Sequence, residues 1–124
     1  MATSIVTRPV GPTYAISVAN TQTTAITVSP TGNDQCNYAE FTNPGATDVC
    51  VVVAPFAATP ATPALAFPVA GTPTVPNSFM LPHGMTQPRI VAVPAGQGGG
   101  FSVSAIGSAA GPSIIYITPV GDQS

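Results

Sequence analysis

Short apolar runs alternate with turn residues along this chain, and no window repeats its apolar positions at the spacing of a helix. In the segment TYAISVA, Tyr14, Ile16 and Val18 alternate with smaller residues, which is the pattern of a half-buried strand. Runs of β-favouring residues bounded by Pro, Gly, Asn and Asp predict strands at 13–19, 24–29, 35–42, 47–54, 89–93, 101–106 and 113–118, and a weaker one at 78–81. About eight strands at this spacing predict an all-β chain, folded as a single antiparallel β-sandwich or jelly-roll-like domain.

The turns and one continuous apolar run refine this prediction. Asn43-Pro44-Gly45 is expected to close a tight hairpin between the strands at 35–42 and 47–54, and Gly111-Pro112 to precede the last strand. We therefore expect hairpins to dominate the connections. The run from Val49 to Val53 is apolar at every position, which indicates a strand buried on both faces, or one whose outer face meets another chain.

The segment 1–12 precedes the first expected strand and is predicted to be an extended N-terminal arm, with the sandwich domain at 13–122. It carries Ile5, Val6, Pro9 and Val10, which would suit a strap that reaches a neighbouring molecule. A frayed terminus is the alternative.

Residues 55–77 form an unusually long segment rich in Pro, Ala and Thr. Loops of this length inside a compact domain are usually functional or disordered. Large apolar side chains favour a functional loop, because a linker has no need of them unless they dock on a surface. The expected partner-binding residues in and just after the loop are Phe56, Leu65, Phe67, Val69 and Phe79.

Charge is scarce: two arginines, four acidic residues and no lysine stand among 124 residues, with a formal net charge of -2. Nucleic-acid binding needs clustered basic residues, and membrane spans need long apolar stretches, so we expect neither kind of partner. The first residues resemble no signal peptide, so synthesis and retention in a cytosol are expected. A surface with so little charge hardly repels copies of itself, which favours a protein that works packed against a partner.

Candidate catalytic and metal-binding residues are few. His83 could form a catalytic triad with Asp48 or Asp122, but no Gly-x-Ser-x-Gly nucleophile motif is present. Cys36, Cys50 and His83 are too few to close a zinc site and lack its spacing. We therefore expect no enzyme, no cofactor and no metal. The two cysteines are expected to be free thiols, although a one-residue change of register would permit a disulfide.

The order of turns and strands from residue 13 to residue 122 resembles a family of small virion proteins of tailed bacteriophages, encoded among the capsid-assembly genes. The matching segments are Tyr38 to Gly45, Val49 to Val53, Leu81-Pro82-His83-Gly84, Val93-Pro94-Ala95-Gly96, Ser102 to Ile106 and Ile115 to Pro119. The long Pro/Ala/Thr-rich loop and the glycine run at Gly98 to Gly100 depart from the family pattern.

The resemblance implies a β-sandwich component of a virion, a capsid cement or decoration protein that stabilises an icosahedral head. Its partner would be the major capsid protein, and it would act on the capsid surface alone or as a dimer or trimer, after synthesis in the bacterial cytoplasm. The alternative is a tail- or fibre-associated module that recognises carbohydrate or a receptor. The absence of tryptophan and the presence of only three tyrosines count against sugar binding.

Overall fold

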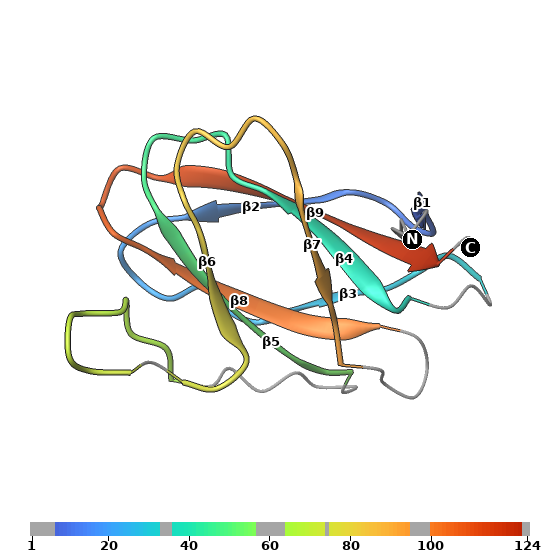
Figure 1. The fold of residues 1–124 in the computed structure, drawn as a ribbon, viewed down its shortest axis with the longest axis horizontal. Helices are drawn as coiled ribbons and strands as arrows, with labels where there is room; N and C mark the ends of the chain where they lie inside the picture. The colour runs from blue at the N-terminus through green and yellow to red at the C-terminus, as the bar shows by residue number, and fades with distance from the viewer. Residues whose placement is uncertain (1–6, 33–35, 57–63, 74, 95–99, 123–124) are drawn as a thin grey trace, which may run out of the picture.

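The computed structural model describes residues 7–32, 36–56, 64–73, 75–94 and 100–122, which form nine β-strands and no helix. None of this described part could therefore cross a membrane as a helix. The strands are β1 (Thr7–Pro9), β2 (Tyr14–Val18), β3 (Ile26–Val28), β4 (Tyr38–Thr42), β5 (Val49–Pro55), β6 (Ser78–Leu81), β7 (Arg89–Ala92), β8 (Phe101–Gly107) and β9 (Ser113–Asp122). The prediction of an all-β antiparallel sandwich is confirmed, and all eight expected strands are present (Figure 1).

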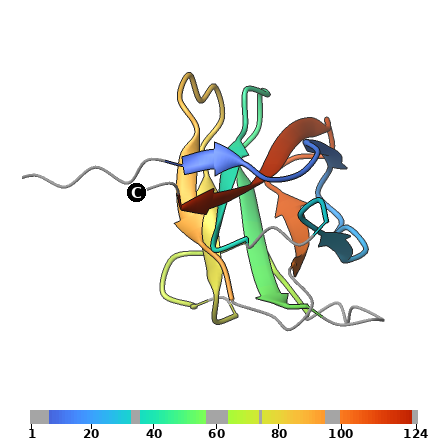
Figure 2. The same ribbon diagram turned by 90° about the vertical axis from the view of Figure 1, so that its right-hand side faces the viewer.

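Two antiparallel sheets form the two layers of the sandwich (Figures 1 and 2). In sheet A, β9 pairs with β4 on one side and with both β1 and β2 on the other, and β7 forms the far edge beyond β4. Sheet B has the order β3-β8-β5-β6. Its longest ladder joins β5 to β8 over seven residue pairs.

The predicted hairpin at Asn43-Pro44-Gly45 is wrong, because β4 belongs to sheet A and β5 to sheet B. The connection from β8 to β9 also crosses between the sheets. Among the strands described here, β5 and β6 are the only consecutive pair that is hydrogen-bonded. The turn before the last strand is confirmed, since β9 begins directly after Gly111-Pro112.

The main core lies between the sheets and contains Val49, Val51 and Val53 from one face of β5. The other face of β5 presents Cys50 and Val52 to a second, smaller apolar cluster that includes Leu65. Of the two explanations for the continuous apolar run, burial on both faces within one chain is therefore correct. The long loop of the chain itself supplies the cover.

The sheet begins earlier than expected. Thr7 to Pro9 form β1 and pair with Val120 to Asp122, because β9 continues past Thr118 and presents a further length of ladder. Val10 is buried, and its N–H donates to the Pro119 carbonyl oxygen at 2.9 Å. Residues 7–10 of the expected arm are thus part of the sandwich, and Ile5 and Val6 lie outside the described residues.

Both cysteines are free and buried. Cys36 belongs to the main core and Cys50 to the second cluster, on the opposite side of sheet B. Burial raises the pKa of each thiol.

Candidate interaction surface

The outer face of sheet A is the largest candidate for a binding surface. Ala39 and Phe41 of β4 and Ile115 and Ile117 of β9 are buried in the main core. Because side chains alternate along a strand, the residues between them project away from the core. By register, the part of the outer face that lies over residues 113–118 of β9 and the strands beside them comprises Thr13, Ala15 and Ser17; Ile114, Tyr116 and Thr118; Tyr38, Glu40 and Thr42; and Ile90 and Ala92.

Large apolar side chains are concentrated on this face. Ile90 is 47% exposed, Ile114 46% and Tyr116 40%, and these are three of the four exposed large hydrophobics among the described residues. Tyr116 lies between Ala15 and Thr42 in the ladders of its two neighbouring strands. Ile114 and Tyr116 are neighbours on one face of β9, and β4 separates them from Ile90. Contiguous exposed apolar surface marks interaction sites on soluble proteins.

The polar residues of the outer face are mainly hydroxyls. The Oγ1 atoms of Thr13 and Thr118 share a hydrogen bond of 2.8 Å, and Thr118 lies opposite Glu40 on β4. Glu40 is the one charged residue of the face as its residues are defined above. The surface therefore offers hydroxyl and apolar contacts and very little charge.

Leu65 and Phe67 of the long loop pack on the chain's own sheet B, whereas the sequence predicts that they contact a partner. Leu65 is buried, and its N–H donates to Gln22 Oε1 at 2.9 Å. Phe67 and Val75 pack on the same second cluster, which also includes Ile106. Leu65 therefore has no surface left for a partner, and Phe67 is half-buried against the chain's own sheet B.

Phe79 closes one open side of the sandwich. Its ring meets that of Phe41 edge-on at a centroid distance of 5.0 Å, and the Arg89 guanidinium carbon lies 5.1 Å from the centroid of the Phe79 ring. Arg89 Nη1 also donates to the Met80 carbonyl oxygen at 2.9 Å. Arg89 thus joins β7 of sheet A to β6 of sheet B.

The remaining expected partner-binding residues differ in exposure. Val10 is buried in the main core, so it cannot contact a partner directly. Phe56 is half-buried, and Pro9 is exposed. Val69, 64% exposed, forms an isolated bridge with Thr72.

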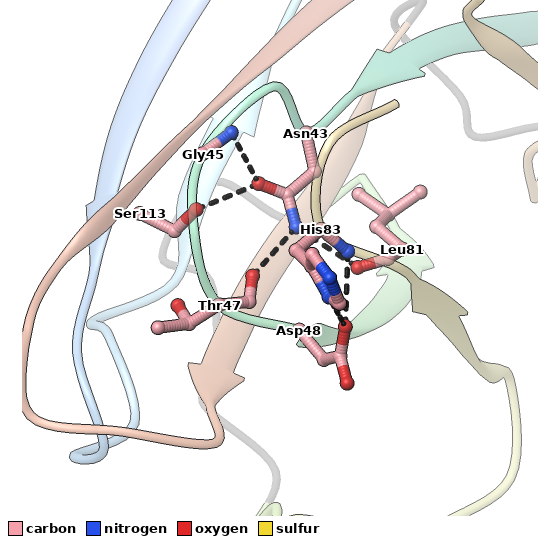
Figure 3. Close-up of polar contacts among 7 residues, drawn as sticks. All are labelled: Asn43, Gly45, Thr47, Asp48, Leu81, His83 and Ser113. Atoms are coloured by element: carbon pink, nitrogen blue, oxygen red, sulfur yellow. Dashed lines mark hydrogen bonds and ion pairs between the residues drawn. The ribbon is translucent and has the colours of Figure 1, made fainter. Parts of the chain in front are cut away.

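A buried polar cluster, here called the Asn43 cluster, organises one end of the sandwich (Figure 3). Asn43 Nδ2 donates to the carbonyl oxygens of Thr47 and Leu81, both at 2.9 Å. Asn43 Oδ1 accepts from the Gly45 N–H at 3.2 Å and from Ser113 Oγ at 2.7 Å. One fully buried amide therefore ties together the start of β9, the end of β6 and the crossover from β4 to β5.

Asp48 and His83 meet next to this cluster. Asp48 Oδ1 accepts from the His83 backbone N–H at 2.9 Å and lies 2.7 Å from His83 Nδ1 (Figure 3). These contacts, the side-chain hydrogen bond first, lower the pKa of Asp48. Within the described residues, no hydrogen bond joins His83 to a hydroxyl or a thiol.

The part of the chain that the structure describes contains no group of three or more His, Cys, Asp or Glu side chains that could hold a metal ion. Comparison with protein-family models, curated proteins and solved structures finds no match.

Sequence reasoning missed the outer face of sheet A, although a signal for it is present. In the segment SIIYIT, Ile114 and Tyr116 alternate with Ile115 and Ile117, so both faces of the strand are apolar. The face with Ile115 and Ile117 packs in the core. The face with Ile114 and Tyr116 is not used by the core and is available to contact another molecule.

Proposed function

We propose that this chain is a structural protein of a tailed-bacteriophage virion, a cement or decoration protein that binds the icosahedral head without covalent bonds. Its partner is the major capsid protein. The observation that carries this proposal is the nearly uncharged outer face of sheet A, with Ile90, Ile114 and Tyr116 exposed on it. The resemblance of the turn and strand order to small virion proteins supplies the class of partner.

The proposed mechanism is cross-bracing by many weak contacts. Each copy places the outer face of sheet A against the shell, where Ile114 and Tyr116 lose their exposure to water. Burial of apolar area stabilises such a contact by about 25 cal/mol per Å² before the costs of association. Many copies act on one closed lattice, so modest affinities combine to resist opening of the shell.

The sandwich is suited to this role because its outer face is rigidly held. Tyr116 and Ile114 lie on β9, the strand that pairs with β1, β2 and β4. Their backbone therefore loses little freedom on binding, which lowers the entropic cost of each contact.

The test uses heads prepared without this chain, to which purified protein is added back. Ile114→Lys and Tyr116→Lys should leave the melting temperature near that of the wild type but reduce the number of copies bound per head at least tenfold at subsaturating concentration. Val69→Lys is the matched control, because Val69 is exposed outside sheet A. If both sheet variants saturate heads as the wild type does, the outer face is not the docking surface; if the wild type does not bind heads, the proposed function is wrong.

One observation favours the alternative of a carbohydrate- or receptor-binding module. Tyr116 is an exposed aromatic ring with Thr42 as its cross-strand neighbour, and aromatic rings beside hydroxyls suit sugar recognition. Binding of the wild type to host-cell glycans or host cells, lost in Tyr116→Ala, with no binding to heads, would favour this alternative.

A further inference from the structure

β7 forms one edge of sheet A, where it pairs with β4 alone; at the other edge β2 pairs with β9 alone. The four residues of β7, Arg89 to Ala92, are exposed or half-buried. An edge strand presents unpaired N–H and C=O groups to which another strand can add. Natural proteins usually protect such edges with lysine, proline, inward-pointing charge or a short strand; β7 is short and flanked by prolines, but no lysine or proline lies within it.

The alternation of backbone hydrogen bonds along β7 identifies the residues whose backbone N–H and C=O groups point away from β4. The Val93 N–H donates to the Asn37 carbonyl oxygen at 3.1 Å, so Val93 faces β4 with its backbone. Backbone direction alternates along a strand, so Val91 also faces β4, whereas the N–H and C=O of Ile90 and Ala92 point away from it. Within the described part of the chain, no hydrogen bond is made by Ile90 or Ala92 on that outer side.

Two other places at the rim of the sandwich, after β1 and at β6, carry hydrogen bonds beyond the strand ladders. The Thr31 N–H donates to the Val10 carbonyl oxygen at 2.6 Å, which ties the segment after β3 to the segment after β1. At β6, the Met80 carbonyl oxygen accepts a hydrogen bond from Arg89. The β7 edge has no such cover among the residues described.

Two prolines restrict how another strand can add to β7. Pro88 and Pro94 flank the strand and are in the same phase as Ile90 and Ala92, but neither has an N–H to donate. If a second β7 paired antiparallel with Ile90 opposite Ile90, Ala92 would lie opposite Pro88. If Ala92 lay opposite Ala92, Ile90 would face Pro94. In the register with Ile90 opposite Ala92, both residues of each copy face a residue that has a backbone N–H to donate.

We propose that β7 pairs antiparallel with β7 of a second copy of this chain, about a two-fold axis at Val91. Each Ile90 then exchanges both backbone hydrogen bonds with Ala92 of the other copy, and sheet A continues across the dimer. This inference does not rest on the proposed virion function.

A second copy fits this edge for three reasons. The Ile90 side chain lies beside the small Ala92 of the other strand, so a large residue packs on a small one. The two Arg89 residues lie at opposite ends of the paired strands, so no like charges are directly opposed. The prolines limit the edge to a length that its own sequence matches, so the pairing closes as a dimer and does not extend into a fibre.

Sedimentation of the purified full chain, at concentrations up to the millimolar range, tests the interface. The wild type should form a dimer, and Ala92→Pro should be monomeric, with its dissociation constant raised at least tenfold. Proline at this position fixes φ and removes an N–H that points away from β4, so every hydrogen bond to β4 is kept and circular dichroism should stay that of the wild type. Ile114→Lys, on the face of sheet A and not at its edge, is the control and should still dimerise. A monomeric wild type, or a dimer that persists in a folded Ala92→Pro variant, would overturn the proposal.

Engineered disulfides test the register independently, and they decide the matter if Ala92→Pro fails to fold. In the proposed register the two Val91 residues form a non-hydrogen-bonded pair with Cα atoms about 4.5 Å apart, within the range of a disulfide. Val91→Cys should therefore give a cross-linked dimer under mild oxidation. Ala92→Cys should not, because its two copies are offset by two residues and lie more than about 7 Å apart. Cross-linking at position 92 and not at 91, or at neither, would contradict the pairing.

Discussion

Ser113 Oγ donates a hydrogen bond of 2.7 Å to Asn43 Oδ1, joining two residues that are 70 positions apart in the chain. Both side chains are buried. The bond connects the first residue of β9 to the crossover that carries the chain from sheet A to sheet B. The turn at Asn43 thus holds together segments that are distant in sequence, because the Asn43 side-chain amide is hydrogen-bonded to partners in three separate parts of the chain.

Asn43→Ala should destabilise the protein strongly. The substitution leaves the carbonyl oxygens of Thr47 and Leu81 and the Gly45 N–H without their partner. Each buried polar group left unpaired costs about 1–3 kcal/mol, so we expect a total loss of about 3 kcal/mol or more in the free energy of unfolding. Ser113→Ala removes one bond and should cost about 1 kcal/mol. Urea denaturation of the two variants measures both values.

Thr47→Val is a control for this argument. Thr47 Oγ1 is buried and has no hydrogen-bond partner in the described structure, while the Thr47 carbonyl oxygen that binds Asn43 is unchanged by the substitution. We expect a change of less than about 0.5 kcal/mol, or a gain in stability, because no hydrogen bond is lost. A loss of stability as large as that of Asn43→Ala would show that the cluster is destabilised by any substitution, whether or not a hydrogen bond is removed.

Gly45→Ala should be destabilising for steric reasons. A Cβ atom at Gly45 would overlap Ser113 Oγ and come within 3.1 Å of the Ser113 Cα. Backbone must then move, and we expect a cost of about 1–3 kcal/mol. Gly111→Ala is the matched control, since a Cβ there meets nothing within 4 Å. It should be neutral or slightly stabilising. Thermal unfolding of both variants provides the comparison, and equal melting temperatures would contradict it.

The sequence predicts the strands of this fold well and its connections poorly. Strand positions follow from local alternation, as in Tyr14, Ile16 and Val18, which the structure places in β2. Connections depend on which sheet accepts the next strand. The turn at Asn43-Pro44-Gly45 has the same local chemistry whether it closes a hairpin or crosses the sandwich, and its outcome depends on Ser113 and Leu81, which are distant in sequence.

The candidate binding surface, like the fold, can be predicted from the sequence only in part. Residue type does not distinguish exposed from buried apolar side chains, so the sequence predicts Leu65 at an interface, whereas the structure buries it in the second cluster. The exposure of Ile90 and Ile114 depends on register across three pairs of strands, which no single segment encodes. The scarcity of charge, in contrast, is a property of composition and needs no structure.

The thiols should be unreactive in the folded protein. Cys36 and Cys50 are buried on opposite sides of sheet B, and burial raises the pKa of each, so the thiolate is scarce at neutral pH. Alkylation at pH 7 should label neither until denaturant is added, and a reductant should leave the melting temperature unchanged. Cys36→Ser and Cys50→Ser should each cost about 1–2 kcal/mol. A lower melting temperature in reductant would indicate a disulfide.

Acid should weaken the contact between Asp48 and His83. The His83 side chain and backbone N–H lower the folded-state pKa of Asp48, so the carboxylate contributes stability above its unfolded pKa, about 4. That contribution is lost as the pH falls through the lower folded-state value. Asp48→Asn should therefore flatten the acid limb of the melting-temperature profile, and His83→Ala should flatten it partly because the backbone bond remains. An Asp48→Asn profile parallel to that of the wild type below pH 4 would show that the contact does not contribute.

Attachment to heads should depend little on salt. Interfaces that rely on charge lose affinity as ionic strength rises, because the Debye length shrinks about threefold between about 0.05 and 0.5 M sodium chloride. The outer face of sheet A carries Glu40 as its charged residue and otherwise offers Ile, Tyr, Ala and hydroxyl groups, whose contacts simple salts barely weaken. The number of copies per head should accordingly stay nearly constant across this range in sedimentation of washed particles. Glu40→Gln should bind with the same salt profile, whereas release of half or more of the bound protein by salt alone would mean that the shell is recognised through charge.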